Sequence, residues 1–138
     1  MSGLLLDANS IMLLTRSGWA PAEDDAVSTA GIAAYELGNA VWKELNIFHK
    51  LTTDDARLLL TVFHETLLRL RVEPQAGLVE RIEILDNADR YGLSYYDSCY
   101  LTAAAGLGAT LVTEDKGLKR SAEERGIPVA SAKDILVS

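Results

Sequence analysis

Four acidic residues follow predicted strands or begin predicted helices, positions from which their side chains could meet in an α/β domain. Asp7 directly follows an apolar run at 4–6, and Asp115 follows a second strand-like run. Glu36 lies about one turn into a helical pattern, and Asp97 lies in the first turn of a later helix. Because parallel strands end at one edge of a sheet and the following helices begin there, we expect the four carboxylates to gather at that edge. Crowded carboxylates repel one another unless a cation neutralises them.

The chemistry of these side chains indicates a hard cation. Carboxylate oxygens, without histidine or cysteine, are ligands that favour Mg²⁺ or Mn²⁺. His49 and His64 lie alone in the sequence, and Cys99 is the only cysteine. We therefore expect neither a structural zinc site nor an internal disulfide. Cys99 stands two residues after Asp97, but a free cysteine in a helix is far more often a core residue than a nucleophile.

Each of the four acids also has a purely structural explanation. Asp7 and Asp115 could each be the N-cap of the helix that follows. Asp97 could reach back to the Ser94 amide in a capping box, and Glu36 could be a solvated residue stabilised by the helix dipole. Taken one at a time, these explanations are favoured. The placement of all four acids at one sheet edge is what favours the cation site.

Short strand-like runs alternate with helical patterns along the chain. The runs lie at 3–6, 27–30, 71–73, 109–113 and 127–130. Strands separated by helices need crossover connections, so we expect an α/β fold with a short, mainly parallel central sheet covered by helices on both faces. With 138 residues, of which 49% are hydrophobic, the chain can bury one ordinary core. We expect a single domain over 1–138.

Two helical patterns carry a narrow apolar stripe, and a third is more widely apolar. The stripes are Leu37, Val41, Leu45 and Phe48 in one helix and Leu78, Ile82 and Leu85 in another. The third pattern, 54–70, follows a candidate capping box at 52–55 and has more apolar surface than one buried stripe needs. Two explanations stay open, deep burial by neighbouring elements or an interface with a partner. We expect a homodimer that uses this helix.

The connecting segments carry signals of their own. Gly106 and Gly126 indicate helix ends. Segment 15–25, with Gly18, Trp19 and Pro21, is the best candidate for a long mobile loop. Trp19 could stack on a base or pack as an apolar lid on its own domain.

Charge and hydropathy limit the partners. Twenty acidic residues against thirteen basic ones give a net charge of −7, which argues against binding nucleic acid through a broad basic surface. That argument weakens if the four acids hold a cation. No stretch approaches the roughly 20 apolar residues of a membrane span, and the N-terminus has no basic leader, so we expect a cytoplasmic protein without a membrane segment.

Four segments resemble, in order, the motifs of the PIN domain, in particular those of VapC-like toxins of toxin–antitoxin pairs. They are "LLLDANS", "AAYELGNAVWKE", "LSYYDSCYLTAA" and "LVTEDKGLKRSAEERGI". The motif positions are Asp7 and Asn9, then Glu36 and Leu37, then Asp97 in an aromatic-rich helix start, then Thr113, Asp115 and Leu118. None of these motifs is specific alone, but four in order, covering nearly the whole chain, are a strong signal.

The resemblance implies a Mg²⁺- or Mn²⁺-dependent ribonuclease that cuts single-stranded or looped RNA and is held inactive by an antitoxin. It implies that Asp7, Asp97 and Asp115 are direct or water-mediated ligands of one or two metal ions. Glu36 would be a ligand or an aid to the attacking water, and the remaining motif residues Asn9 and Thr113 would orient the ligands. In-line attack by water would leave a 5′-phosphate and a 3′-hydroxyl.

Basic residues near the acids could guide an RNA backbone. Lys43 shares the helix face of Glu36 at i+7, and Lys116, Lys119 and Arg120 follow Asp115. Such side chains on helices are usually only solvated, which is the competing explanation.

Two other classes of α/β phosphate enzyme require motifs that this chain lacks. A receiver domain needs a second acid next to the first-strand aspartate, and an aspartate-phosphorylating hydrolase needs D-x-D where this chain has Asn9. Two alternatives within the same fold stay open, a noncatalytic PIN-like binding module and a housekeeping RNA-processing nuclease.

Overall fold

The computed structural model describes residues 3–22, 25–74 and 76–137. Its strands form a five-stranded sheet in the order β3-β2-β1-β4-β5, and every strand pair is parallel. The strands are β1 (Leu4–Leu6), β2 (Val27–Thr29), β3 (Arg71–Val72), β4 (Thr110–Val112) and β5 (Val129–Ala130). All five predicted strands are confirmed, each shorter than predicted by one or two residues.

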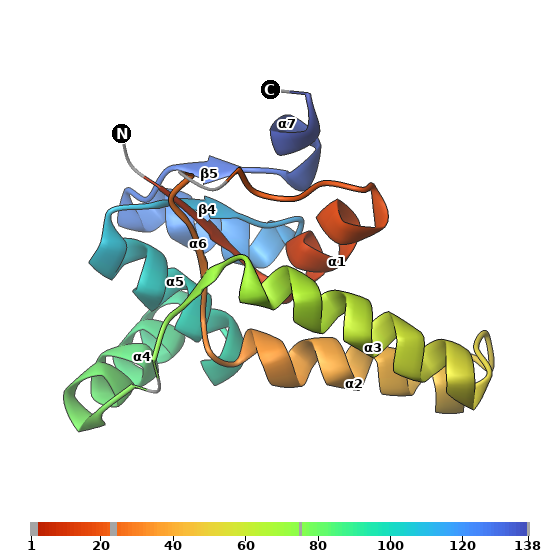
Figure 1. The fold of residues 1–138 in the computed structure, drawn as a ribbon. Helices are drawn as coiled ribbons and strands as arrows, with labels where there is room; N and C mark the ends of the chain where they lie inside the picture. The colour runs from red at the N-terminus through yellow and green to blue at the C-terminus, as the bar shows by residue number, and fades with distance from the viewer. Residues whose placement is uncertain (1–2, 23–24, 75, 138) are drawn as a thin grey trace.

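Helices connect the strands. They are α1 (Ala8–Arg16), α2 (Ala33–Asn46), α3 (Thr53–Leu68), α4 (Leu78–Tyr91), α5 (Tyr95–Leu107), α6 (Lys116–Arg125) and α7 (Ala132–Leu136). Right-handed crossovers put α1, α2 and α3 on one face of the sheet and α4, α5 and α6 on the other. The packing agrees, because α1 contacts α2 and α3 while α5 contacts α4 and α6. In Figure 1 the pair α2 and α3 extends well beyond the sheet. The predicted α/β architecture with helices on both faces is thus confirmed.

The adjacent strands β1 and β4 contribute fully buried residues to the hydrophobic core. Leu5 and Leu6 of β1 and Leu111 and Val112 of β4 are fully buried, as expected for parallel strands covered on both faces. Leu6 pairs with Val112 in the register of these strands. From β1 the chain moves outward to β2 and β3, then returns to β4 and continues to β5. This reversal leaves a crevice beyond the carboxyl ends of β1 and β4, where ligands of open α/β sheets bind.

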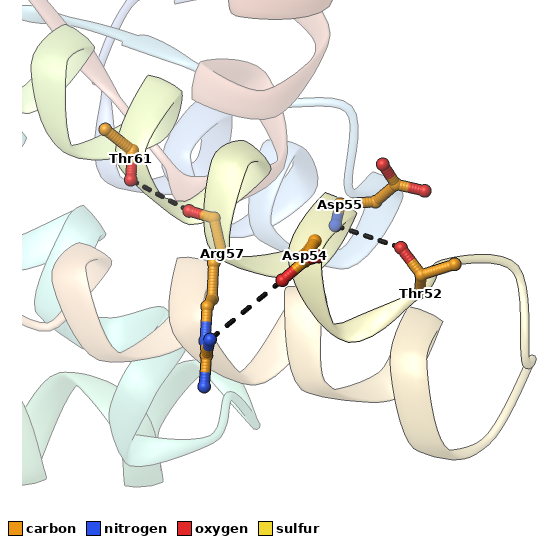
Figure 2. A network of polar contacts seen from close by, with 5 residues as sticks. All are labelled: Thr52, Asp54, Asp55, Arg57 and Thr61. Carbon is orange, nitrogen blue, oxygen red and sulfur yellow. Dashed lines mark hydrogen bonds and ion pairs between the residues drawn. The ribbon is translucent and has the colours of Figure 1, made fainter.

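Helix ends follow the predicted signals in part. At the start of α3 the Thr52 hydroxyl accepts a hydrogen bond from the Asp55 amide at 3.1 Å (Figure 2). Among the described residues, no reciprocal bond from the Thr52 amide to the Asp55 side chain completes a capping box there. Gly126 caps α6 in the left-handed region as predicted. The prediction that Gly106 ends α5 is wrong, because the helix continues to Leu107 and Gly108 takes the left-handed conformation.

The apolar stripes are only partly buried. Leu37 and Val41 of α2 lie in the core, but Phe48 lies beyond the helix and is exposed. The predicted stripe of α4 is wrong as a buried face, since its members Leu78, Ile82 and Leu85 are exposed. The residues of α4 that are buried are Ile84 and Ala88, spaced one helical turn apart. The Ser98 hydroxyl of α5 donates to the Ile84 carbonyl at 2.7 Å, which fixes this face against α5.

The third helix keeps much of its apolar surface in solvent. Phe63 of α3 is buried, but the exposed fraction of Leu58 is 63% and that of Leu68 is 72%, with Leu60 and Val62 also exposed. Deep burial by neighbouring elements is therefore the wrong explanation for its composition. The interface explanation stays a prediction.

The segment predicted as a mobile loop begins inside α1, which continues to Arg16. Trp19 is partly buried and packs against the hydrophobic core, in agreement with the apolar-lid explanation rather than with base stacking. Glu23 and Asp24 of this segment lie outside the described residues. In the described part of the chain, no helix has the length and hydropathy to cross a membrane.

Candidate functional site

The first and fourth acids meet through a threonine between them. Asp7 follows β1 and caps α1, with Oδ1 accepting from the Ser10 amide at 2.9 Å. Its Oδ2 accepts from the Thr113 hydroxyl at 2.5 Å. The oxygen of the same hydroxyl accepts from the Asp115 amide at 3.1 Å. Thr113, directly after β4, thereby links the Asp7 carboxylate to the Asp115 backbone, which suits the orienting role predicted for it.

Asp115 also caps a helix. Its Oδ1 accepts from the Leu118 amide at 2.8 Å, at the start of α6. The capping explanation is thus confirmed for both Asp7 and Asp115. Capping does not exhaust these side chains, because each carboxylate oxygen carries two lone pairs and a cap uses one. The two functions are compatible at the same residue.

The second acid is anchored by a residue that the sequence analysis missed. Glu36, in the first turn of α2, is half-buried, and its Oε1 accepts from the Tyr100 hydroxyl at 2.5 Å. Tyr100 of α5 is 1% exposed. It lies three residues after Asp97, and therefore on the same helix face. The spacing of Tyr100 from Asp97 within "YYDSCY" was the sequence signal that could have identified Tyr100 as a site residue. The explanation of Glu36 as a merely solvated residue is wrong.

The third acid keeps its carboxylate free of the predicted capping box. At the start of α5 the Ser94 hydroxyl accepts from the Asp97 amide at 3.0 Å. Within the described residues the Ser94 amide makes no reciprocal bond to the Asp97 carboxylate. The cap bond is made by the Asp97 amide, and the Asp97 carboxylate interacts with the Ser94 side chain, which lowers the pKa of that carboxyl group against the effect of burial.

All four acids line one open groove of about 910 Å³ at the carboxyl edge of the sheet. Asn9 and Lys43, both exposed, also line it. The groove further includes residues that the sequence analysis did not name, among them Arg16, Asn39, Glu44 and Glu114. The three bases of α6 that were predicted to guide an RNA backbone are exposed and lie outside the groove lining; they are Lys116, Lys119 and Arg120.

The electrostatics of the groove show that the acids act on one another. Burial raises the pKa of Asp7, and the nearby charge of Asp115 raises it further, while hydrogen bonds from Thr113 and Ser10 oppose the rise. Burial likewise raises the pKa of Glu36 and of Asp97, with contributions from the other carboxylates. The ionised forms of Asp7, Glu36 and Asp97 are therefore disfavoured in the folded protein unless a cation shares the groove.

The donor set fits a hard divalent cation. Among the described residues, no three His, Cys, Asp or Glu side chains converge as a ready-made metal cage. Mg²⁺ does not require one, because it keeps several waters and binds through one or two carboxylates together with substrate phosphates. An open, mutually repelling set of carboxylates is consistent with that mode of binding.

Cys99 is not part of this chemistry. It packs against the hydrophobic core, and burial, followed by the charges of Glu36 and Asp97, raises the pKa of its thiol. A thiol kept neutral is a poor nucleophile and a poor metal ligand. The prediction that Cys99 is a core residue is confirmed.

Comparison with known proteins supports the same fold. No protein-family model matches the sequence. The chain is 28% identical over 122 residues to Ribonuclease VapC3 of Pyrobaculum aerophilum, covering 83% of this chain and 91% of that protein. Its structure is similar to the crystal structure of PAE2754 from Pyrobaculum aerophilum, with a TM-score of 0.81, 24% identity and coverage of 99% of this chain and 95% of the other.

Two more distant structural neighbours are toxin–antitoxin assemblies. VapBC2 from Rickettsia felis, bound to a promoter DNA fragment, has a TM-score of 0.64 at 16% identity, covering 93% of this chain and 97% of the other. A toxin–antitoxin complex from Klebsiella pneumoniae has a TM-score of 0.60 at 17% identity, with coverage of 94% and 98%. The predicted PIN-like fold and the resemblance to VapC-like proteins are confirmed by these similarities.

Proposed function

We propose that this chain is a metal-dependent endoribonuclease of the VapC type, the toxin of a toxin–antitoxin pair, that cleaves single-stranded or looped RNA in the cytoplasm. The observation that carries the proposal is the groove at the carboxyl edge of a parallel sheet, which is lined by four carboxylates from four separate segments. The sequence similarity to Ribonuclease VapC3 supports the reaction class. The antitoxin complexes among its structural neighbours support a protein inhibitor as partner.

In this proposal the chain's own residues position the reactants. Asp7, Asp97 and Asp115 would hold Mg²⁺ or Mn²⁺, directly or through water, and Glu36 would join them or accept a proton from the attacking water. When bound, the ion supplies a water of lowered pKa and polarises the scissile phosphate. Thr113 holds one carboxylate of the set. In-line attack by water then leaves a 5′-phosphate on one product and a 3′-hydroxyl on the other.

The test is cleavage of a labelled single-stranded RNA by the purified chain. We expect cleavage with added Mg²⁺ or Mn²⁺, none in EDTA, and a higher melting temperature when the metal is present, because a ligand that binds the folded state stabilises it. Cleavage that continues undiminished in chelator would overturn the metal mechanism. Stabilisation by metal without any cleavage would instead favour a noncatalytic binding module.

The toxin role is tested separately from the activity. Co-expression with the product of the neighbouring reading frame should suppress RNA cleavage if that product is an antitoxin. A ribonuclease that no neighbouring product inhibits would favour a housekeeping role in RNA processing.

We further propose a homodimer built on the exposed apolar surface of α3. Leu58 and Val62 are exposed one helical turn apart, so a charge at Leu58 would lie inside an interface formed there. Leu58→Glu is expected to convert a dimer into a monomer in light scattering at micromolar concentration. Leu136→Glu, an exposed leucine of α7, is the matched control and should leave the dimer intact. A wild-type monomer at that concentration would contradict the proposal.

A further inference from the structure

The groove has two chemically different ends. Two helices that begin beside the acids also line the groove at their opposite ends. Arg16 lies in the last turn of α1, and Lys43 in the last turn of α2. Both side chains line the same groove as the four carboxylates. Among the described residues that line the groove, Arg16 and Lys43 are the only ones with cationic side chains.

The two ends are too far apart for one phosphate to contact both. With a helix rise of about 1.5 Å per residue, Lys43 lies about 10 Å along its axis from Glu36, and Arg16 about 13 Å from Asp7. A phosphate held at the carboxylates through a metal ion therefore does not reach these cations. A neighbouring phosphate of the same RNA strand would.

Arg16 is held in place by contacts that a ligand could replace. Its guanidinium pairs with Glu44 at 2.8 Å and lies over the Phe63 ring, 6.0 Å from the centroid. The side chains of Arg16 and Glu44 are 49% and 23% exposed. An exposed ion pair of this kind contributes little free energy. A planar guanidinium also matches a phosphate well, because it can donate two parallel hydrogen bonds.

We propose, on the basis of the ribonuclease function above, that Arg16 and Lys43 form a subsite for RNA phosphates flanking the cleaved bond. Glu44 pairs with Arg16 when RNA is absent and gives it up when a phosphate arrives. Both cations also lie at helix C-termini, where the helix dipole favours positive charge. The helix dipole explains why a basic residue stands at each helix C-terminus. It does not explain why the basic side chains of two different helices line the same groove.

The subsite is tested by binding, so that turnover plays no part. Fluorescence anisotropy would measure the affinity of a short labelled single-stranded RNA for the full chain carrying Asp97→Asn, with Mg²⁺ present. Arg16→Gln and Lys43→Gln are each expected to weaken binding about fivefold to tenfold. Each should also reduce the slope of log K against log salt by about 0.7, the value for one phosphate contact on a single strand.

Two further variants separate recognition from structure. Glu44→Gln is expected to tighten binding about twofold to threefold, because it frees Arg16. Arg57→Gln is the matched control, since Arg57 is an exposed cation of α3 that pairs with Asp54 at 4.0 Å (Figure 2) and does not line the groove. It should change neither the affinity nor the salt slope.

The opposite signs make the outcome decisive. If Arg16 only links α1 to α2, Glu44→Gln and Arg16→Gln should lower the melting temperature together and affect RNA in the same direction, which would overturn the subsite. If Arg16→Gln does not fold, Lys43→Gln with an unchanged salt slope would overturn it as well. A wild-type chain that binds RNA with these dependences but never cleaves it would overturn the ribonuclease proposal and uphold the subsite.

Discussion

Asp97→Asn is expected to reduce RNA cleavage roughly 10²-fold or more, the scale of losing one preorganised electrostatic group, while the metal-free protein stays at least as stable as wild type. The structure separates the two roles of this residue. The helix cap depends on the Asp97 amide and the Ser94 hydroxyl, and asparagine keeps that amide. The carboxylate is half-buried, and burial, followed by the charge of Asp115, raises its pKa, while a hydrogen bond with the Ser94 side chain opposes the rise. Removing its charge therefore relieves an unfavourable interaction.

The sign of the stability change also depends on pH. An acid whose pKa is higher in the folded state costs stability above that pKa, and the cost disappears as pH falls and the group is protonated. In EDTA the variant should melt at or above the wild-type temperature at neutral pH, and the difference should shrink as the pH is lowered. With Mg²⁺ the order should reverse, because the wild type gains more from the ion.

Thermal melts with EDTA and with Mg²⁺, run beside a cleavage assay, measure all three effects. Asp89→Asn is the matched control, since Asp89 is an exposed residue of α4 outside the groove lining. It should leave both the Mg²⁺ response and the cleavage rate unchanged. If Asp97→Asn melts lower in EDTA yet retains its Mg²⁺ response and its activity, Asp97 has only a structural role.

The position of the acids could be predicted from the sequence because it depends on short-range rules. A buried parallel strand reads as an apolar run, its carboxyl end is where the next residue turns out of the sheet, and a polar cap begins the following helix. Asp7 satisfies all three rules, and Asp115 caps its helix shortly after the end of β4; the strands before the two residues are adjacent in the sheet. The same rules explain why the capping explanation held for these two residues.

What the sequence did not reveal depends on packing between distant segments. Tyr100 reads as one more aromatic residue in a core helix, and only the fold, which brings the start of α2 close to α5, shows that its hydroxyl meets Glu36. The stripe at Leu78, Ile82 and Leu85 has helical periodicity, but periodicity does not show which face meets α5. The small residue Ala88 and the hydrogen bond to the Ile84 carbonyl decide that. Arg16 was missed because its position in the groove depends on where α1 ends relative to α2.

Tyr100→Phe is expected to lower kcat for RNA cleavage about 10-fold to 100-fold, the range seen when the partner of a metal ligand is removed, with little change in KM. The substitution keeps the buried ring and deletes only the hydroxyl that donates to Glu36 at 2.5 Å. The carboxylate then loses the contact that fixes it toward the other acids. Its pKa, already raised by burial and lowered by this hydrogen bond, should rise further. Activity should therefore fall off at a higher pH in the variant than in the wild type.

A double-mutant cycle shows whether the hydroxyl acts through Glu36. In a Glu36→Gln background, Tyr100→Phe should have little additional effect on kcat, because the group that the hydroxyl positions is already altered. The Mg²⁺-dependent rise in melting temperature should shrink in Tyr100→Phe and shrink no further in the double variant. Tyr95→Phe, a partly exposed residue of the same helix outside the groove lining, is the matched control for aromatic substitution. Losses in kcat that simply multiply across the cycle would mean that Tyr100 serves the packing of α5 and not the orientation of Glu36.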